Sequence, residues 1–331
     1  MPRRSKKPRQ GNLFRVLFLA VLAFVLLITV LLNGSEVRLL NPKGLIAQQE
    51  LYLGLVVTAV LAVLIVPSLI FAYFVAWKYR ESSPKKAAYE PNARYGKRLD
   101  VAIWGIPTVF MLILSLLLVP ATHKLEPKKA IVSSQKPLNI KVVSLRWKWV
   151  FIYPEQKIAT VNFVQIPVDR PVQFDLTADE SPMSSFWIPN LSGMLYAMTG
   201  MTNQLNLVAN EEGDYPGSSG EITGSGFADM RFTARASSQE EFDEWVRVVK
   251  MAPETLDTHE YQELLVPSEA DPQVVYSAVE DNLYDKVLMK YMAAGGGHGH
   301  GGHGAAQPTP KPHSDAHAET EPHTHAEGHT H

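Results

Sequence analysis

The sequence predicts a membrane-anchored protein in which transmembrane helices precede an all-β sandwich, a short helical region and a disordered histidine-rich tail. Three observations support this class. Apolar residues are concentrated in roughly the first 120 positions. Short segments rich in Val, Ile, Phe and Thr then recur from Lys136 to Ala236. Nine of the eleven histidines follow Gly295. The expected regions are 1–34 (signal peptide or signal anchor), 35–123 (helical hairpin with a cytoplasmic loop), 124–237 (β domain), 238–294 (helical region) and 295–331 (tail).

Three apolar runs occupy the N-terminal third: Val16–Leu32, Leu51–Trp77 and Val101–Ala121. A helix needs about 20 apolar residues to cross the hydrocarbon core of a bilayer. The second and third runs meet that length, and their prolines, Pro67 and Pro107, are tolerated where neighbouring helices satisfy the freed carbonyls. Both runs are therefore predicted to span the membrane.

The first run has two interpretations. A basic segment followed by an apolar core and "LLNGS" describes a secretory signal peptide as well as a retained helix. The core is longer than the ~7–15 residues typical of a signal peptide, which favours an anchor. Cleavage would leave the rest of the topology unchanged.

Positive charge sets the orientation. Six Lys or Arg residues lie in the first fifteen positions and seven lie within 78–98, whereas the loop between the first two runs carries only Arg38 and Lys43. Lys and Arg concentrate in cytoplasmic loops. The N-terminus and the 78–98 loop are therefore expected inside, and everything after the third run outside.

Composition excludes several classes of function. The net charge of −2 gives no general affinity for nucleic acid. The absence of cysteine rules out disulfides, thiolate catalysis and cysteine-ligated metals. The β region contains no histidine that could activate a serine, so no catalytic residue is assigned.

The regions after the hairpin have their own signals. Polar alternation in the β region predicts one solvent-exposed face per sheet. Ser238 with Glu241 forms a capping pattern before the amphipathic "EEFDEWVRVVK", and two weaker helices are expected to follow. The low-complexity tail cannot bury enough apolar surface to order itself. Its imidazoles are suited to weak binding of copper, nickel or zinc, by His298, His300 and His303.

Several motifs together resemble subunit II of the haem–copper terminal oxidases, and most closely the bo-type quinol oxidases. They are "LRWKWVFIYPE", "SSFWIP" and "GSSGEITGSGFADM", within a similarity running from about Asn41 to Lys250. A weaker similarity covers the aromatic "DNLYDKVLMKYMA". The resemblance implies a cupredoxin-like β domain, which in the cytochrome c branch holds a dinuclear copper centre.

Four of the five side-chain ligands of that copper centre are missing when the family pattern is placed on this sequence. Hydroxyls are too hard and too weakly acidic to replace thiolates for soft copper. The resemblance implies that Met230 is a core residue and that Trp147 and Trp149 serve packing. The positions of the ligands are Ser184, Ser219, Glu221 (through its carbonyl), Thr223, Phe227 and Met230.

The resemblance implies a supporting subunit of a proton-pumping quinol oxidase in the aerobic respiratory chain. The chain would bind no cofactor of its own. Haems and copper would lie in subunit I, and subunits III and IV, membrane lipid and ubiquinol would be the other partners. The location would be the bacterial inner membrane with the β domain in the periplasm. Asp100 in "DVAIWGIP" occupies the family position of a proton-entry carboxylate, usually Glu.

Two alternatives remain open. The histidine-rich tail favours a membrane-anchored periplasmic protein that handles copper. The domain order also fits a divergent cytochrome c oxidase subunit II, although the missing Cys pair argues against it.

Overall fold

The computed structural model describes residues 37–79, 96–181 and 183–294. The described residues belong to one compact unit. The first apolar run, Val16–Leu32, and the histidine-rich tail with His298, His300 and His303 lie outside the described residues. The expectations for these segments stay predictions.

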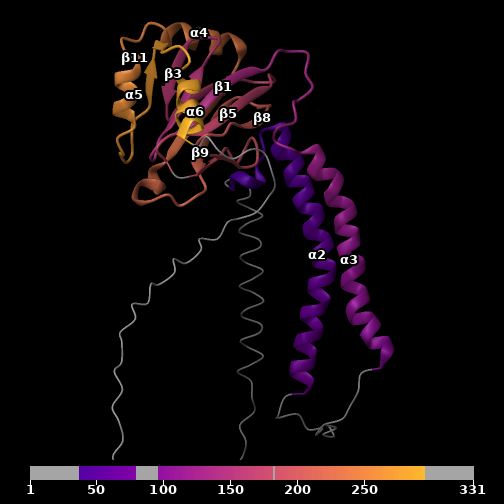
Figure 1. The fold of residues 1–331 in the computed structure, drawn as a ribbon. Helices are drawn as coiled ribbons and strands as arrows, with labels where there is room; N and C mark the ends of the chain where they lie inside the picture. Colours follow the sequence, from indigo (N-terminus) through magenta and orange to yellow (C-terminus); the bar gives the residue numbers. More distant parts are fainter. Residues whose placement is uncertain (1–36, 80–95, 182, 295–331) are drawn as a thin grey trace, which may run out of the picture. The chain divides into compact units, whose positions relative to one another are not determined.

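Two long apolar helices open the described part of the chain (Figure 1). After a short 3-10 turn, η1 (Arg38–Leu40), come α2 (Leu45–Lys78) and α3 (Lys97–Lys124). Their most apolar 18-residue windows have mean hydropathies of 2.8 and 2.4, and none of the residues in those windows is buried within the chain. Both predicted membrane helices are confirmed as helices long enough to span a bilayer.

Hydroxyl side chains within these helices form hydrogen bonds to backbone carbonyls of the same helix. Ser68 and Thr108, each next to a helix-interior proline, donate to the carbonyls of Leu64 and Trp104 at 2.7 Å. A hydroxyl in a lipid-facing helix needs such a partner because no water is available to it. The helices can therefore expose these residues to an apolar environment.

The β domain is a sandwich of two mixed sheets, as predicted. One sheet has the order β12-β3-β2-β1-β5-β8 and the other β4-β10-β9-β6-β7; β1 pairs with β5, and β4 with β10, in parallel. The strands are β1 Leu138–Ser144, β2 Trp149–Tyr153, β3 Ile158–Val161, β4 Phe163–Pro167, β5 Val172–Ala178, β6 Ser184–Trp187, β7 Leu195–Ala197, β8 Asn203–Leu207, β9 Gly213–Ser219, β10 Arg231–Ser237 and β12 Val274–Tyr276.

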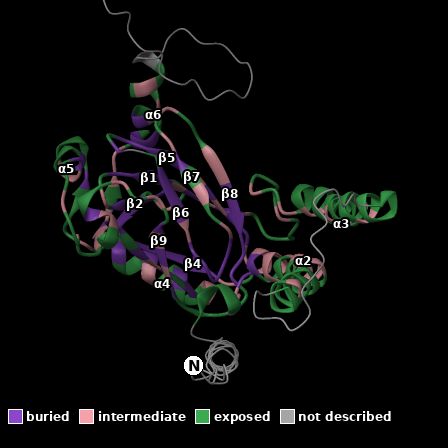
Figure 2. Cartoon of the chain, turned by 90° about the horizontal axis from the view of Figure 1, so that it is seen from below, coloured by how far each residue is buried: buried purple, intermediate pink, exposed green. Residues whose placement is uncertain are grey.

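Aromatic side chains fill the space between the sheets. Phe186 stacks on Phe232 with ring centroids 4.9 Å apart, and Trp149 meets Phe186 edge-on at 5.3 Å. Successive residues of a strand point to opposite faces, so Trp149, Phe151 and Tyr153 enter this core while their neighbours do not. Most of the strand residues around this core are buried (Figure 2).

The expectation of one solvent-exposed face per sheet is wrong for the six-stranded sheet. Val150 and Ile152, on the outer face of β2, are buried in a second apolar cluster with Tyr261, Leu283 and other residues of the C-terminal segment. The C-terminal segment, defined here as residues 250–294, covers that face and adds β12 to its edge. Its other elements are β11 Thr255–Leu256, α5 Thr258–Leu264, β13 Ala278–Val279 and α6 Leu283–Ala294.

The predicted amphipathic helix is α4, Gln239–Val249. Ser238 caps it by accepting a hydrogen bond from the Glu241 backbone N–H at 3.1 Å, as the capping pattern predicts. Phe242 and Val246 bury its apolar face in the core of the sandwich. The two weaker helices expected further along are α5 and α6.

Candidate functional site

The residues at the copper-ligand positions gather at one end of the five-stranded sheet. Ser184 opens β6, Ser219 closes β9, and these strands pair through Phe186 and Ser219. The Ser219 N–H donates to the Met230 carbonyl at 3.3 Å, immediately before β10 begins. The connection between β9 and β10, residues 220–230, carries the remaining three positions and the 3-10 helix η2 (Ser225–Asp229). The pairing of β6 with β9 and the β9–β10 hairpin therefore bring the predicted positions to one end of the sheet. No bound metal is needed to hold this backbone arrangement.

The side chains at these positions do not fit a dinuclear copper centre. Ser219 is 6% exposed, and its hydroxyl turns back on its own loop, 3.5 Å from the Glu221 carbonyl. The Thr223 hydroxyl is buried without a hydrogen-bond partner among the described residues. Phe227 offers no donor atom, and Met230 lies fully buried in the core. A single thioether among hydroxyls lacks the imidazoles and bridging thiolates that soft copper requires.

Trp147 fills the space inside the 220–230 connection. A Cβ built at Gly226 would lie 2.5 Å from the Trp147 ring, and one at Gly224 would lie 2.8 Å from it, so only glycine fits at either position. Trp147 itself has φ 66, a left-handed conformation that is unusual for a bulky residue. Such a conformation persists only where surrounding packing enforces it. Here the contact between the indole and the two glycines supplies that packing.

Asp100 lies far from this loop, at the other end of α3. It is exposed in the first turn of the helix, where a carboxylate is favourable beside the helix N-terminus. From Asp100 to the end of α3 at Lys124 the helix rises about 36 Å, which exceeds the ~30 Å of a hydrocarbon core. Leu125 leads into the β domain, so Asp100 lies at the opposite end of α3 from the connection to that domain.

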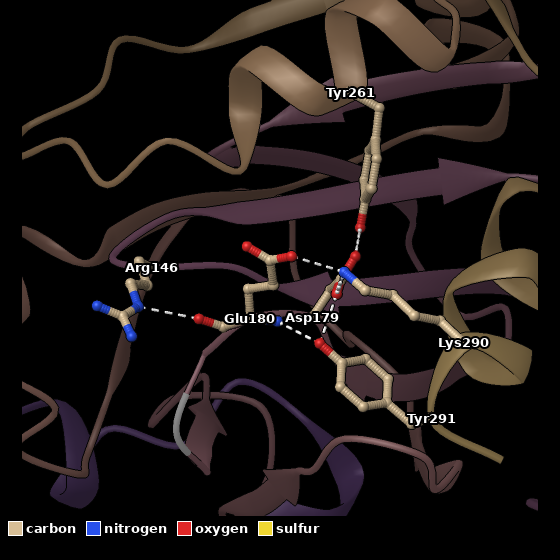
Figure 3. Close-up of polar contacts among 6 residues, drawn as sticks. All are labelled: Arg146, Asp179, Glu180, Tyr261, Lys290 and Tyr291. Atoms are coloured by element: carbon tan, nitrogen blue, oxygen red, sulfur yellow. Dashed lines mark hydrogen bonds and ion pairs between the residues drawn. The ribbon is translucent and has the colours of Figure 1, made fainter. Parts of the chain in front are cut away.

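A polar cluster joins the C-terminal segment to the β domain (Figure 3). Asp179 is 1% exposed and accepts hydrogen bonds from the hydroxyls of Tyr261 at 2.8 Å and Tyr291 at 2.7 Å. Lys290 lies 2.9 Å from the same carboxylate and 2.7 Å from Glu180. Burial first, and then the charge of Asp179, raises the pKa of Tyr261.

A buried ion pair forms a second connection to the same segment. Lys148 lies between the two tryptophans in sequence, yet its side chain is 3% exposed and its Nζ lies 3.2 Å from Asp271 Oδ2. The ammonium group also donates to the Val266 carbonyl at 3.2 Å and to the Ser268 hydroxyl. Sequence reasoning missed both connections, although the tyrosines of 250–294 were a signal that the segment packs.

Comparison with known proteins places the chain among respiratory oxidase subunits. Residues 154–237 match the family model "Cytochrome C oxidase subunit II, periplasmic domain", and residues 250–295 match "COX Aromatic Rich Motif". The chain is 41% identical over 292 residues to cytochrome bo(3) ubiquinol oxidase subunit 2 of Pseudomonas putida, covering 88% of this chain and 90% of that protein.

Two further relatives carry related names. Ubiquinol oxidase subunit 2 of Acetobacter aceti is 41% identical over 263 residues, with 79% of this chain and 85% of the relative covered. Quinol oxidase subunit 2 of Bacillus cereus is 37% identical over 243 residues, with 71% and 81% covered. The similarity therefore extends through the hairpin, the β domain and the C-terminal segment.

Proposed function

This chain belongs to the family of subunit II of the quinol oxidases, and from that premise we propose that it is a supporting subunit of a proton-pumping quinol oxidase in an aerobic respiratory chain. It carries no redox centre of its own. Quinol oxidation and oxygen reduction take place at the haems and copper of subunit I, and subunits III and IV complete the complex. The hairpin lies in the bacterial inner membrane and the β domain in the periplasm.

The observation that carries this proposal is the chemistry of the 220–230 connection. Its side chains include no thiolate and no imidazole, and Trp147 fills the space against its glycines. A subunit of this kind cannot hold the electron acceptor that a soluble cytochrome needs at this position. Electrons must then reach the haems from a donor that approaches subunit I directly, and a membrane quinol satisfies that condition.

Purification through this subunit in a mild detergent tests the proposal. We expect haem to co-purify, and oxygen uptake to be supported by quinol and not by reduced cytochrome c. Copper analysis of the chain after deletion of 295–331 should find no metal in the β domain. Recovery of the chain without haem, or respiration driven by cytochrome c, would refute the proposal.

Asp100 is the proposed entrance for protons that are consumed or pumped by the complex. Its place in the first turn of α3, across the membrane from the β domain, supports this role. Asp100→Asn removes the group that exchanges protons and is expected to lower quinol-supported oxygen uptake about tenfold, equivalent to about 1.4 kcal/mol in the barrier. Haem content should stay unchanged.

Two matched variants complete the Asp100 experiment. Asp100→Glu restores a carboxylate and is expected to recover most of the activity, because proton exchange requires the acid and not its length. Asp243→Asn changes an exposed carboxylate on α4 and should leave oxygen uptake as it is. If Asp100→Asn keeps full turnover over the whole pH range, the proton-entry role is wrong.

A further inference from the structure

Two adjoining hollows lie where α2 and α3 meet the β domain. The upper one is a cavity of about 330 Å³ enclosed by the start of α2, the chain after α3 and the turn Ser192–Met194. The lower one is a groove of about 490 Å³ between α2 and α3. Leu45, Gln49, Lys124 and Leu125 line both hollows, so the two adjoin.

Hydrogen bonds hold the walls of the upper cavity in place. The backbone N–H of Lys43 donates to the Asn190 carbonyl at 2.7 Å, and that of Ala47 donates to the Leu191 carbonyl at 3.3 Å. After α3, the Pro127 carbonyl accepts from the Asn206 side-chain amide at 3.1 Å. Both helices are therefore fastened to the β domain at the level of the cavity.

The upper cavity contains charges of both signs. Glu50 is half-buried and accepts a hydrogen bond from the Gly193 backbone N–H. A Cβ at Gly193 would lie 2.6 Å from the Glu50 carboxylate, so the turn closes directly on it. Lys124 and Lys129 line the same cavity, and neither forms an ion pair within the described part of the chain. Glu126 is a second carboxylate in the lining. Two carboxylates and two ammonium groups around one space are complementary to a zwitterion.

The lower groove is lined mainly by apolar residues, and its length along α2 matches the thickness of one membrane leaflet. It runs from Leu45 to Val56 along α2, which is about 16 Å at 1.5 Å per residue, against about 15 Å for half of the hydrocarbon core. Tyr52, Leu53 and Ala121 are among its lining residues. An acyl chain fits such a groove, with its polar end at the charged cavity above.

We propose that the two hollows form a binding site for a single phospholipid with a zwitterionic, amine-bearing headgroup from the outer leaflet. The phosphate pairs with Lys124 and Lys129, the ammonium pairs with Glu50, and an acyl chain lies between α2 and α3. A partner helix in the groove would leave the charges of the cavity unmatched, and the neutral ring of a quinone would match neither sign of charge.

Lipid analysis of the chain tests this site and does not depend on the oxidase assignment. Full-length protein would be purified alone and in its complex from mixed phosphatidylethanolamine and phosphatidylglycerol nanodiscs into mild detergent, and retained lipid quantified by mass spectrometry. Ala121→Trp, which fills the groove, is expected to lose the retained phospholipid. Glu50→Gln should lower the ratio of phosphatidylethanolamine to phosphatidylglycerol about tenfold, since a charge-assisted contact is lost.

Matched variants keep the outcome decisive. Lys128→Gln alters a lysine next to the cavity that does not line it, and should retain lipid like the wild type, whereas Lys124→Gln should not. Leu53→Trp gives a second groove-filling variant if Ala121→Trp fails to fold. Equal lipid in all variants overturns the proposal, as would extraction of a quinone in place of phospholipid, or photocrosslinking from position 121 to another subunit and not to lipid.

Discussion

Asp179→Ala is expected to release the C-terminal segment from the six-stranded sheet. The substitution leaves the hydroxyls of Tyr261 and Tyr291 without their shared acceptor and removes one of the two carboxylates that face Lys290. Breaking a buried charged contact costs about 3–5 kcal/mol, and the 43% exposure of Lys290 places the expected loss near the lower end. Urea unfolding of the full chain would measure this loss, and limited proteolysis should cut first within 250–294.

An exposed ion pair in the same domain provides the control. Asp214 accepts two hydrogen bonds from Arg235, at 2.7 and 3.0 Å, but both side chains are about half exposed. Surface pairs contribute about 0–1 kcal/mol, so Asp214→Ala should have a small effect. Equal losses from Asp179→Ala and Asp214→Ala would show that the buried cluster does not hold the segment.

The pH dependence gives a second readout for the same cluster. Burial and Asp179 raise the pKa of Tyr261 and of Tyr291, and, although burial opposes it, hydrogen bonds to Glu180 and Asp179 raise the pKa of Lys290. Groups with raised pKa values stabilise the fold fully below their unfolded pKa values, about 10 for these residues, and lose that contribution as pH rises further. The stability difference between wild type and Asp179→Ala should therefore shrink above about pH 10.

The sequence allowed the helices and the sandwich to be predicted because each depends on local pattern. Run length identifies a membrane helix, and recurring β-branched and aromatic segments identify strands. The covering of the six-stranded sheet was missed, although β2 (Trp149–Tyr153, "WVFIY") contains no charged residue and a continuous apolar run is typical of a strand buried on both faces. The wrong expectation came from applying alternation to every strand.

In the candidate site too, local motifs could be read from the sequence, whereas contacts between distant residues could not. The motif predicts the ligand positions from Ser184 to Met230 by their spacing, and the assignment of these residues to ligand positions stays a prediction. The contacts of Asp179 could not be predicted, because Tyr261 and Tyr291 lie 82 and 112 residues further along the chain. The left-handed conformation of Trp147 could not be predicted from the sequence either, since it depends on packing against glycines about 80 residues away.

Asp271→Ala is expected to destabilise the chain as strongly as Asp179→Ala, because it leaves the Lys148 ammonium buried without a counter-charge. Lys148 is 3% exposed, and its other partners among the described residues are a carbonyl and a hydroxyl. Removing one member of a buried pair costs about 3–5 kcal/mol, whereas replacing both members with apolar groups is often neutral. The double variant Lys148→Met, Asp271→Ala should therefore be more stable than Asp271→Ala alone.

Urea unfolding of the wild type, both single variants and the double variant completes a double-mutant cycle. The cycle gives the interaction free energy between Lys148 and Asp271. Glu155→Ala provides the matched control, since Glu155 pairs with Lys136 at 2.6 Å on the surface and should contribute no more than about 1 kcal/mol. If Asp271→Ala behaves like Glu155→Ala, solvent or a shifted backbone compensates the ammonium. If the double variant instead regains stability, the loss in Asp271→Ala comes from the unpaired ammonium of Lys148. The turn Trp147–Trp149 is then held to the C-terminal segment through this pair.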